Sequence, residues 1–425
     1  MGRRPARDVA YAERGQGEHG ESGVSAPGQL TRVSVAPKAS GSPAGYEVVI
    51  GESHLALELS NLSVLLQRPP GRVVVVIDTG VPDAITDRVI ESLHVGRWNV
   101  TTIQMKPSES VKTLATVRGL LLRMQQHKLE RGEPIVAIGG GVVGDTVGYA
   151  ASAYRRGVPV IQCPTTLLAM VDASVGGKTG VNLDVPNAAN PDGPKLLMKN
   201  AIGAFHQPAA VFADVETLES LTDRDFRCGL AECYKHAMLA SDWGDPDLLA
   251  WTRSQRAAIM GRDAETLAAL VARSVALKAR VVADDERETR PDGGRATLNL
   301  GHTFAHAIET IPGLTPDGDP QNAPLRHGEA VAIGLVAATA TAVRAGLCDP
   351  VVLDHVRADL NAFELPTSVG GLPDHATLLQ TMSHDKKAVG AAPRLILPTS
   401  LGSVRVVDTA PVEAIAAGWD AVRAG

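Results

Sequence analysis

The sequence predicts an α/β domain built on a parallel sheet, followed by an all-helical domain. Short β-branched runs alternate with helical patterns from Tyr46 to about residue 220, which is typical of βαβ units with right-handed crossovers. After Leu218 the pattern becomes helical. The length of 425 residues also favours more than one hydrophobic core. We therefore expect two domains that meet near residue 220, with a ligand site in the cleft between them.

Each element of the α/β domain is predicted from its own pattern. Strands are expected at β-branched runs and helices at amphipathic runs, in the order strand 47–50, helix 54–66, strand 72–78, helix 110–131, strand 134–138, helix from 142, strand 158–163 and strand 211–214. In the second domain, apolar residues at helical spacing predict helices over 263–284, 298–311 and 329–344. A turn at 398–402 separates two further predicted strands, 394–397 and 403–407.

The first 45 residues are expected to lie outside the fold. They are rich in glycine, serine, arginine and glutamate and show no apolar period, which is the composition of a disordered tail. The sequence thus divides into a tail over 1–45, an α/β domain over 46–220 and a helical domain over 221–425. No apolar segment follows the first arginines, so no secretory signal is expected.

Net charge and cysteine content limit the expected partners. The formal net charge of -6 argues against the broad basic surface that nucleic acids and acidic membranes require. The longest weakly polar run, 330–343, is shorter than a membrane span and is expected to be a buried helix. The four cysteines form no C-x-x-C pair, which favours a reducing cytoplasm over a disulfide framework.

The stretch from Gly139 to Asn182 carries the strongest signal of a binding site. Three glycines follow the apolar run Pro134–Ile138, so a ligand could approach the backbone where a helix begins. Charged residues then recur through an apolar segment, where they would be costly to bury without partners. The dinucleotide pattern G-x-G-x-x-G is only loosely met, and a P-loop is excluded because Asp172 stands where its first glycine is required. A tight turn without a ligand is the alternative.

Three helical segments offer candidate metal ligands. His302 and His306 lie four residues apart on one predicted helix face, but without the glutamate of H-E-x-x-H they are not a protease signature. Glu232 shares a helix face with Lys235, and His327 opens the last apolar helix. One carboxylate and two imidazoles suit a catalytic zinc that keeps positions open. Structural histidines and an exposed ion pair are the alternatives.

Further cations extend this charged set. Lys278 lies inside the apolar stripe of its predicted helix, where a lysine must extend to solvent or find an anion. Arg295, a few residues before Asn299, would add to the same surface. Lys386 and Lys387 add two cations near the C-terminus, with a solvated loop as the alternative.

Ordered motifs lie between Gly139 and Lys387, within a similarity that runs from about Tyr46 to near the C-terminus. They are, in chain order, GGGVVGD, RRG, PTTLLA, D-x-S-V-G-G-K-T, KNxIGAFxQP, GLAExxK, LNLGHTFxHAIE, HGEAVAIG and DKK. In these motifs the chain resembles the 3-dehydroquinate synthase family of NAD-dependent sugar-phosphate cyclases. The resemblance implies a Rossmann-like N-terminal domain that holds NAD, a helical domain that holds Zn²⁺, or Co²⁺ as an alternative, and a homodimer in the cytoplasm.

The resemblance also implies a reaction. A small phosphorylated sugar acid, 3-deoxy-D-arabino-heptulosonate 7-phosphate, would be converted to 3-dehydroquinate and phosphate in the shikimate pathway of aromatic amino acid biosynthesis. The implied steps are transient NAD oxidation, phosphate elimination, re-reduction and aldol cyclisation. Such an enzyme is a carbon–oxygen lyase that eliminates phosphate.

Roles for single residues follow from the resemblance. The implied metal ligands are Glu232, His302 and His327. Cofactor contacts are implied for Asp78, Glu109, Lys112, Gly140, Gly141, Asp145, Thr165, Thr166, Leu168, Asp172, Lys178, Lys199 and Asn200. The positions implied around the substrate phosphate are Arg156, which reaches across the dimer interface, Asn200, Lys235, His306 and one of Lys386 and Lys387. The carboxylate and ring hydroxyls are implied to meet Lys178, Lys278, Arg295 and Asn299. His306 is also a candidate proton relay.

Three features depart from the family pattern. The segment 183–198 is longer than usual, so Lys195 competes with Lys199 for one role. Lys199 is preferred because Lys199-Asn200 precedes the IGAF segment. The segment 288–295 is also extended, and Gly80 stands where the family usually has asparagine.

Other enzymes are kept as alternatives. Of the sister cyclases, 2-epi-5-epi-valiolone synthase and 2-deoxy-scyllo-inosose synthase act on substrates without a carboxylate. Aminodehydroquinate synthase acts on a substrate that has a carboxylate. Presence of Lys278, Arg295, Asn299 and His306 favours a carboxylated substrate. A metal-dependent polyol dehydrogenase would have no use for the phosphate cations, and an inactive homologue would not need all three metal ligands.

Overall fold

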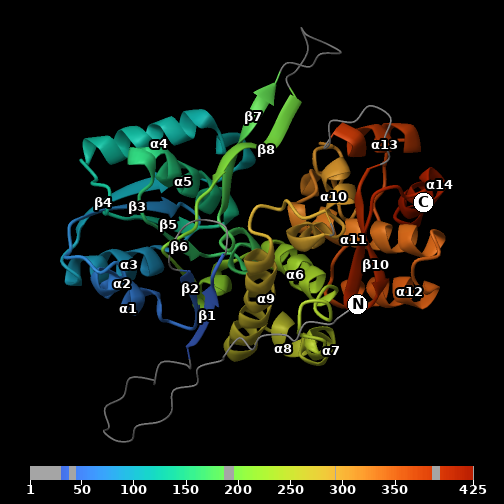
Figure 1. The fold of residues 1–425 in the computed structure, drawn as a ribbon, viewed down its shortest axis with the longest axis horizontal. Helices are drawn as coiled ribbons and strands as arrows, with labels where there is room; N and C mark the ends of the chain where they lie inside the picture. Colours follow the sequence, from blue (N-terminus) through green and yellow to red (C-terminus); the bar gives the residue numbers. More distant parts are fainter. Residues whose placement is uncertain (1–29, 38–44, 186–195, 292, 385–392, 425) are drawn as a thin grey trace, which may run out of the picture.

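The computed structural model describes residues 30–37, 45–185, 196–291, 293–384 and 393–424. An α/β unit and a mainly helical unit lie side by side, and a long β-hairpin runs between them (Figure 1). The predicted fold class is confirmed. Among the described residues, no helix has the length and apolar character needed to cross a membrane.

A seven-stranded sheet forms the centre of the α/β unit, in the order β1-β2-β9-β6-β5-β3-β4. Its strands are β1 (Thr31–Val35), β2 (Tyr46–Gly51), β3 (Arg72–Asp78), β4 (Asn99–Met105), β5 (Ile135–Gly139), β6 (Val160–Pro164) and β9 (Ala210–Asp214). Strand β1 is antiparallel to β2, and the other neighbouring strands are parallel. The inner strands are buried on both faces, which explains their continuous valine and isoleucine runs.

Helices cover both faces of this sheet. Helices α1 (Leu55–Ser60), α2 (Leu62–Leu65) and α3 (Asp83–Val95) lie over one face, and α4 (Leu114–Gln126) and α5 (Gly141–Ala153) lie over the other. The sequence predicted most of these elements but not α3 or β4. Strand β4 is an edge strand whose residues are mostly exposed or half-buried, so its apolar signal is weak.

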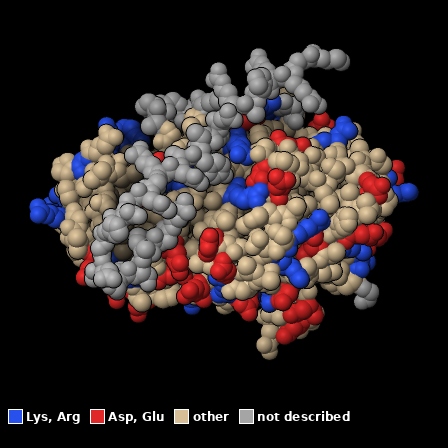
Figure 2. Space-filling model, turned by 90° about the horizontal axis from the view of Figure 1, so that it is seen from below, with Lys and Arg blue, Asp and Glu red and all other residues tan. Residues whose placement is uncertain are grey.

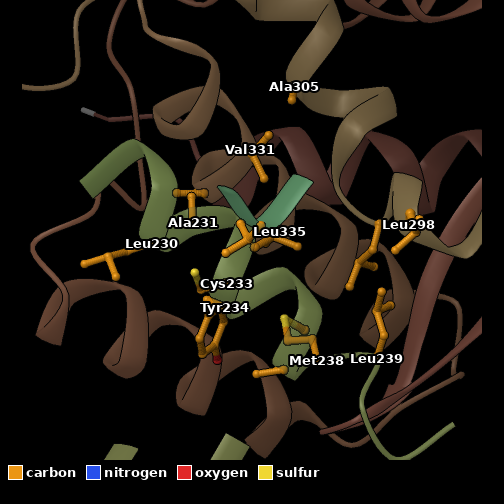
Figure 3. Close-up of a cluster of buried hydrophobic side chains, with 14 of the residues drawn as sticks. Leu230, Ala231, Cys233, Tyr234, Met238, Leu239, Leu298, Ala305, Val331 and Leu335 are labelled. Atoms are coloured by element: carbon orange, nitrogen blue, oxygen red, sulfur yellow. The ribbon is translucent and has the colours of Figure 1, made fainter. Parts of the chain in front are cut away.

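The second unit is built from helices around α11. Its helices are α6 (Asp223–Ala237), α7 (Leu248–Ser254), α8 (Arg256–Met260), α9 (Ala264–Asp284), α10 (His302–Glu309), α11 (His327–Arg344), α12 (Pro350–Ala362), α13 (His375–His384) and α14 (Val412–Ala421). Residues 328–342 of α11 are all buried. Figure 3 shows Leu230 and Tyr234 of α6 beside Val331 and Leu335 of α11. This shared core fixes two of the three helices that carry candidate metal ligands.

Two strands interrupt the helical unit. They are β10 (Leu395–Ser400) and β11 (Ser403–Val407), which pair antiparallel. The sequence predicted both strands and the turn between them. The description of this unit as all-helical therefore needs one correction, because a hairpin is part of it.

The expectation that residues 1–45 lie outside the fold is wrong for Thr31–Val35. These residues form β1, in which Val33 and Val35 are 7% and 0% exposed and belong to the core that includes α9. Arg32 adds ion pairs on the outer face, to Glu58 at 2.6 Å and to Glu47 at 3.2 Å. Five residues are too few to show a period by themselves, and their packing partner α9 lies more than 200 residues later in the chain.

Deleting residues 1–40 is expected to lower the thermal midpoint by a few degrees relative to deletion of residues 1–29. The longer deletion removes β1, so the buried side chains of Val33 and Val35 and the β1–β2 hydrogen bonds are lost. Thermal unfolding of the two truncated proteins, followed by circular dichroism, measures the difference. Equal midpoints would contradict a stabilising role for β1.

Candidate functional site

A cavity of about 680 Å³ lies between the two units. The α/β unit contributes the start of α5 and part of the β-hairpin, and the helical unit contributes α10, α13 and the start of α11. Many residues predicted for the site line it, namely Glu109, Lys112, Gly141, Asp145, Thr166, Leu168, Asp172, Lys199, Asn200, His306 and His327. Residues that are far apart in sequence thus share one concave surface of the size expected for a small-molecule site.

The glycine turn forms one end of this cavity. Strand β5 ends at Gly139 and α5 begins at Gly141, beyond the carboxyl end of a parallel strand. A Cβ atom at Gly139 would lie 2.8 Å from Cβ of Asp78 and 2.9 Å from Cγ2 of Val143. Only glycine fits at this position. Gly141 and Val142, in the first turn of α5, line the cavity, and backbone amides at the start of a helix can bind an anion.

Asp78 and Thr165 support this turn and do not line the cavity. The Asp78 carboxylate accepts hydrogen bonds from the amides of Gly80, at 2.7 Å, and Gly140. Burial raises the pKa of Asp78 in spite of these bonds. The amide of Thr165 donates to the carbonyl of Gly139 at 3.0 Å. Gly80 thus contributes a backbone amide at the position where the family usually has asparagine.

A hydrogen-bond network builds the wall of the cavity on the α/β side. Lys112 Nζ donates to Asp145 Oδ2 at 2.6 Å and to Asn200 Oδ1 at 2.5 Å. The side-chain amide of Asn182 donates to Glu109 Oε2 at 2.8 Å, and its Oδ1 accepts from the backbone amide of Asn200 at 2.9 Å. Four predicted cofactor-binding residues are therefore linked through Asn182, which the sequence analysis did not nominate.

The β-hairpin brings Asn200 to this wall. It consists of β7 (Lys178–Val185) and β8 (Leu196–Phe205), and its register shifts between Val181 and Leu183. Asn200 lies opposite this irregularity with φ of 51°, and such bulges redirect side chains. Residues 183–185 and 196–198 of the long segment belong to β7 and β8. Lys199 lines the cavity, and Lys195 lies outside the described residues.

Glu232, His302 and His327 converge beside the cavity. Their ligand atoms all lie within 4.8 Å of one another, and Glu232 is fully buried. Nε2 of His302 and Nε2 of His327 lie 3.4 and 3.3 Å from the same oxygen, Glu232 Oε1. Nδ1 of His302 lies 3.2 Å from the carbonyl oxygen of Leu300, so that this nitrogen can donate while Nε2 stays free for a metal. Two imidazoles and one carboxylate make a donor set suited to zinc.

The electrostatics of the three ligands favour a cation. Burial alone would raise the pKa of Glu232, but Lys235 and His302 hold it well below its usual range. Burial lowers the pKa of His302. Burial also opposes charge on His327, yet its hydrogen bonds to Glu232 and Glu309 raise its pKa to about 10. Metal binding would therefore displace a proton from His327.

Two lysines balance two carboxylates under the cavity. Lys235 Nζ lies 2.5 Å from Glu232 Oε2, and Lys278 Nζ lies 2.5 Å from Asp172 Oδ1. Both lysines are almost completely buried. Burial lowers the pKa of Lys278 to about 8, although Asp172 opposes the shift. Lys278, which the sequence predicts to extend to solvent or pair with an anion, thus pairs with the carboxylate of Asp172.

The approach of α6 to α11 places His327 next to Glu232. A Cβ atom at Gly328 would lie 2.2 Å from the carbonyl oxygen of Cys228, so only glycine allows the two helices to come this close. Glu329, in the first turn of α11, accepts two hydrogen bonds from Arg224 of α6, at 2.6 and 2.8 Å. The contact at Gly328 and this paired interaction fix where α11 begins relative to α6.

A second group of predicted residues lies away from the cavity lining. The Lys178 amine pairs with the Glu288 carboxylate, and Asn299 Nδ2 donates to Glu288 Oε1 at 2.7 Å. Arg295 is 2% exposed and donates to two backbone carbonyls, at 2.6 and 2.8 Å. The cations predicted for the substrate carboxylate are thus partly gathered around Glu288, a residue that the sequence analysis did not nominate.

Among the described residues, Arg156 is a predicted phosphate-binding residue that this chain does not bring to the cavity. Arg156 is exposed, has φ of 66°, and does not line the cavity. Lys386 and Lys387 lie outside the described residues. His306 does line the cavity, with its ring centroid 5.5 Å from that of His302.

Glu309 is a further residue that the sequence analysis missed. Its Oε2 lies 3.4 Å from His327 Nδ1, behind a metal ligand. The available signal was its spacing, because it follows His302 by seven residues and so falls on the same helix face. Glu288 and Asn182 offered no comparable local signal, since their partners lie more than ten residues away.

Comparisons with known proteins agree with this geometry. The protein-family model described as "3-dehydroquinate synthase N-terminal" matches residues 102–228. The family model described as "3-dehydroquinate synthase C-terminal" matches residues 229–388. The chain is 39% identical over 351 residues to the 3-dehydroquinate synthase of Rhodopirellula baltica, covering 83% of this chain and 86% of that protein. It is also 39% identical over 376 residues to that of Caulobacter vibrioides, covering 87% and 94%.

A solved structure shares the fold. The 2-epi-5-epi-valiolone synthase from Streptomyces hygroscopicus, with NAD⁺ and Zn²⁺ bound, superposes with a TM-score of 0.71 at 26% identity. The match covers 88% of this chain and 95% of that protein. Both halves of the family model, the long alignments with the bacterial synthases and the convergence of the three ligands lead to one conclusion: the chain belongs to the 3-dehydroquinate synthase family.

Proposed function

We propose that this protein converts 3-deoxy-D-arabino-heptulosonate 7-phosphate to 3-dehydroquinate and phosphate, as a phosphate-eliminating lyase of the shikimate pathway. The observation that carries the proposal is the convergence of Glu232, His302 and His327 at a cavity whose other end is the glycine turn. This arrangement brings a metal-binding set and a cofactor-binding turn to one substrate-sized space. We further propose that residues 46–220, with β1, and residues 221–425 act as the cofactor and metal domains.

The donor set fits a divalent metal. Oε1 of Glu232 is buried, and the Nε2 atoms of His302 and His327 face it at 3.4 and 3.3 Å. The Streptomyces relative was solved with NAD⁺ and Zn²⁺, which supports the same pair of groups here, with Co²⁺ as an alternative metal. When bound, the metal would polarise a substrate oxygen, and NAD would accept a hydride and return it.

The residues of the cavity would hold and release the phosphate. Asn200 and His306 line the cavity from opposite units, and Lys235 lies buried beside the metal ligands. An amide, an imidazole and an ammonium group can bind phosphate oxygens and stabilise their charge as the C–O bond breaks. A ring nitrogen of His306 could carry a proton to or from the substrate at this stage. No further protein base is required, because the departing phosphate can itself accept a proton.

The contacts of Glu288 favour a substrate that carries a carboxylate. Glu288 already presents a carboxylate to Lys178 and Asn299. A substrate carboxylate would therefore find two donors arranged for such a group, with Arg295 and Lys278 in the same part of the protein. This observation favours the heptulosonate over substrates without a carboxylate. It does not separate 3-dehydroquinate synthase from aminodehydroquinate synthase, which is the second candidate.

The proposal includes a cytoplasmic homodimer that binds neither nucleic acid nor membrane. Figure 2 shows acidic and basic side chains intermixed on the face that it draws, in keeping with the formal net charge of -6. Exposure of Arg156 supports a dimer, since the residue could complete the site of a second copy.

The function is tested by supplying purified enzyme with NAD and Zn²⁺ and offering two substrates separately. Phosphate release from 3-deoxy-D-arabino-heptulosonate 7-phosphate, with 3-dehydroquinate as the product, is expected. Sedoheptulose 7-phosphate, which lacks the carboxylate, should release little phosphate. Comparable turnover of both sugars would contradict the assignment, and accumulation of NADH without phosphate release would indicate a polyol dehydrogenase. A parallel assay of phosphate release from the amino analogue of the heptulosonate phosphate distinguishes 3-dehydroquinate synthase from aminodehydroquinate synthase, the second candidate.

A further inference from the structure

Glu309 links a candidate metal ligand to the opposite side of the cavity. It is the last residue of α10, and its side chain is 9% exposed. One carboxylate oxygen, Oε2, lies 3.4 Å from Nδ1 of His327. The other, Oε1, accepts a hydrogen bond from Nζ of Lys199 at 2.7 Å. The contacts form a chain Lys199–Glu309–His327 that runs from β8 to the start of α11.

The position of Glu309 follows from the geometry of α10. His302 is the first residue of this helix and Glu309 is the last, so about two turns separate them and both project from one face. The helix thus contributes a metal ligand at one end and a carboxylate behind another ligand at the other end. Glu309 also lines the cavity, which places it close enough to respond to what binds there.

The two histidines are oriented by different means. Nδ1 of His302 faces a backbone carbonyl, that of Leu300, two residues away on the same segment. Nδ1 of His327 faces a side chain from another helix, which is itself held by Lys199 from the other unit. At 3.4 Å the Glu309–His327 contact is long for a hydrogen bond, so its strength depends on how firmly the carboxylate is held.

We propose that Glu309 is a positioning residue for the metal site. Its carboxylate accepts a hydrogen bond from the Nδ1–H of His327, which leaves the lone pair of Nε2 directed at Glu232 and the metal. Lys199 holds the carboxylate in this orientation. Because β8 also carries Asn200 in the wall of the cavity, the contact ties metal affinity to the position of the β7–β8 hairpin. This inference rests on the proposed metal role of Glu232, His302 and His327.

Zinc affinity of substituted proteins tests the proposal. Competition with a chromophoric chelator, without substrate, should show Glu309→Ala binding Zn²⁺ roughly 10- to 100-fold more weakly than wild type. Glu309→Gln should lose less Zn²⁺ affinity, because the amide oxygen of glutamine can still accept a hydrogen bond from Nδ1–H of His327. Lys199→Met should weaken binding, and adding it to Glu309→Ala should cause little further loss, since both act through His327. The visible spectrum of the Co²⁺-loaded protein should change in Glu309→Ala.

A matched control separates this role from the general loss of a buried carboxylate. Glu133 is 3% exposed and accepts hydrogen bonds from the amides of Arg72, at 2.8 Å, and Glu130, at 2.7 Å, just before β5 begins. It lies at the end of the strand away from the glycine turn. Glu133→Gln should therefore leave Zn²⁺ affinity and the Co²⁺ spectrum unchanged.

Wild-type Zn²⁺ affinity and an unchanged Co²⁺ spectrum in folded Glu309→Ala would overturn the proposal. If Glu309→Ala does not fold, the Zn²⁺ affinities of Glu309→Gln and Lys199→Met test the proposal instead. Wild-type Zn²⁺ affinity in both variants would overturn it. These measurements do not use turnover. A wild-type protein that binds zinc but does not react with the heptulosonate phosphate would contradict the proposed function and leave the role of Glu309 intact.

Discussion

Substitution of His302 by alanine is expected to abolish turnover and to release most of the bound zinc. The change removes one of three ligands, and Glu232 is left with His327 and the Lys235 amine as neighbours. Loss of a direct ligand should weaken Zn²⁺ binding by more than the roughly 100-fold that outer contacts can cost. Metal content of the purified protein and phosphate release from the heptulosonate phosphate measure the two effects.

His306→Ala provides the matched comparison on the same helix. Its ring lies 5.5 Å from that of His302, yet it does not belong to the ligand cluster. This variant should retain stoichiometric zinc while turnover falls. Full activity with stoichiometric zinc in His302→Ala would refute the ligand assignment, and zinc loss in both variants would show that the helix, not the ligand, is responsible.

Arg156→Ala is expected to lower kcat/KM about 100-fold, the effect of losing a contact to phosphate worth about 3 kcal/mol. Arg156 does not line the cavity of its own chain, so the loss should arise in the partner's site. Co-expression with the His302→Ala chain tests this directly. Each mixed dimer then has one site with all its metal ligands and with arginine supplied by the partner. Random pairing should restore about a quarter of wild-type activity, although neither variant is active alone.

Two controls make the mixed-dimer result decisive. Differently tagged chains purified in sequence confirm that mixed dimers are present, and the two homodimers mixed without exchange set the background. Absence of recovery in verified mixed dimers would contradict the contribution of Arg156 to the partner's site. An unchanged rate in Arg156→Ala itself would remove the residue from the phosphate site.

Much of the fold could be predicted because its signals are local. Strand β3 was predicted with the bounds that it has, since it is a continuous run of apolar β-branched residues buried on both faces. Strand β1 and the β7–β8 hairpin were missed. The two valines of β1 pack against α9, far along the chain, and three apolar side chains of β8, Leu197, Met198 and Phe205, are exposed, so no local pattern of burial marks these strands.

The candidate site divides in the same way. The glycine turn and the three metal ligands carry recognisable patterns, and the structure brings these to one cavity. Glu309 carries a weaker signal, its seven-residue spacing from His302 on one helix face. Glu288 and Asn182 act through partners that lie more than ten residues away, such as Lys178 for Glu288, so no local spacing could identify them.

The sequence by itself determined most of the elements and which donor types are available, because periodicity, glycine turns and ionisable side chains are properties of short segments. Only the tertiary structure decided which of these side chains lie within contact distance of one another. Gly328 lets α11 approach α6 closely enough for His327 to face Glu232, and the irregular β7–β8 hairpin turns Asn200 toward Lys112. Both meetings depend on packing between segments about 100 residues apart, and that packing is a property of the assembled core.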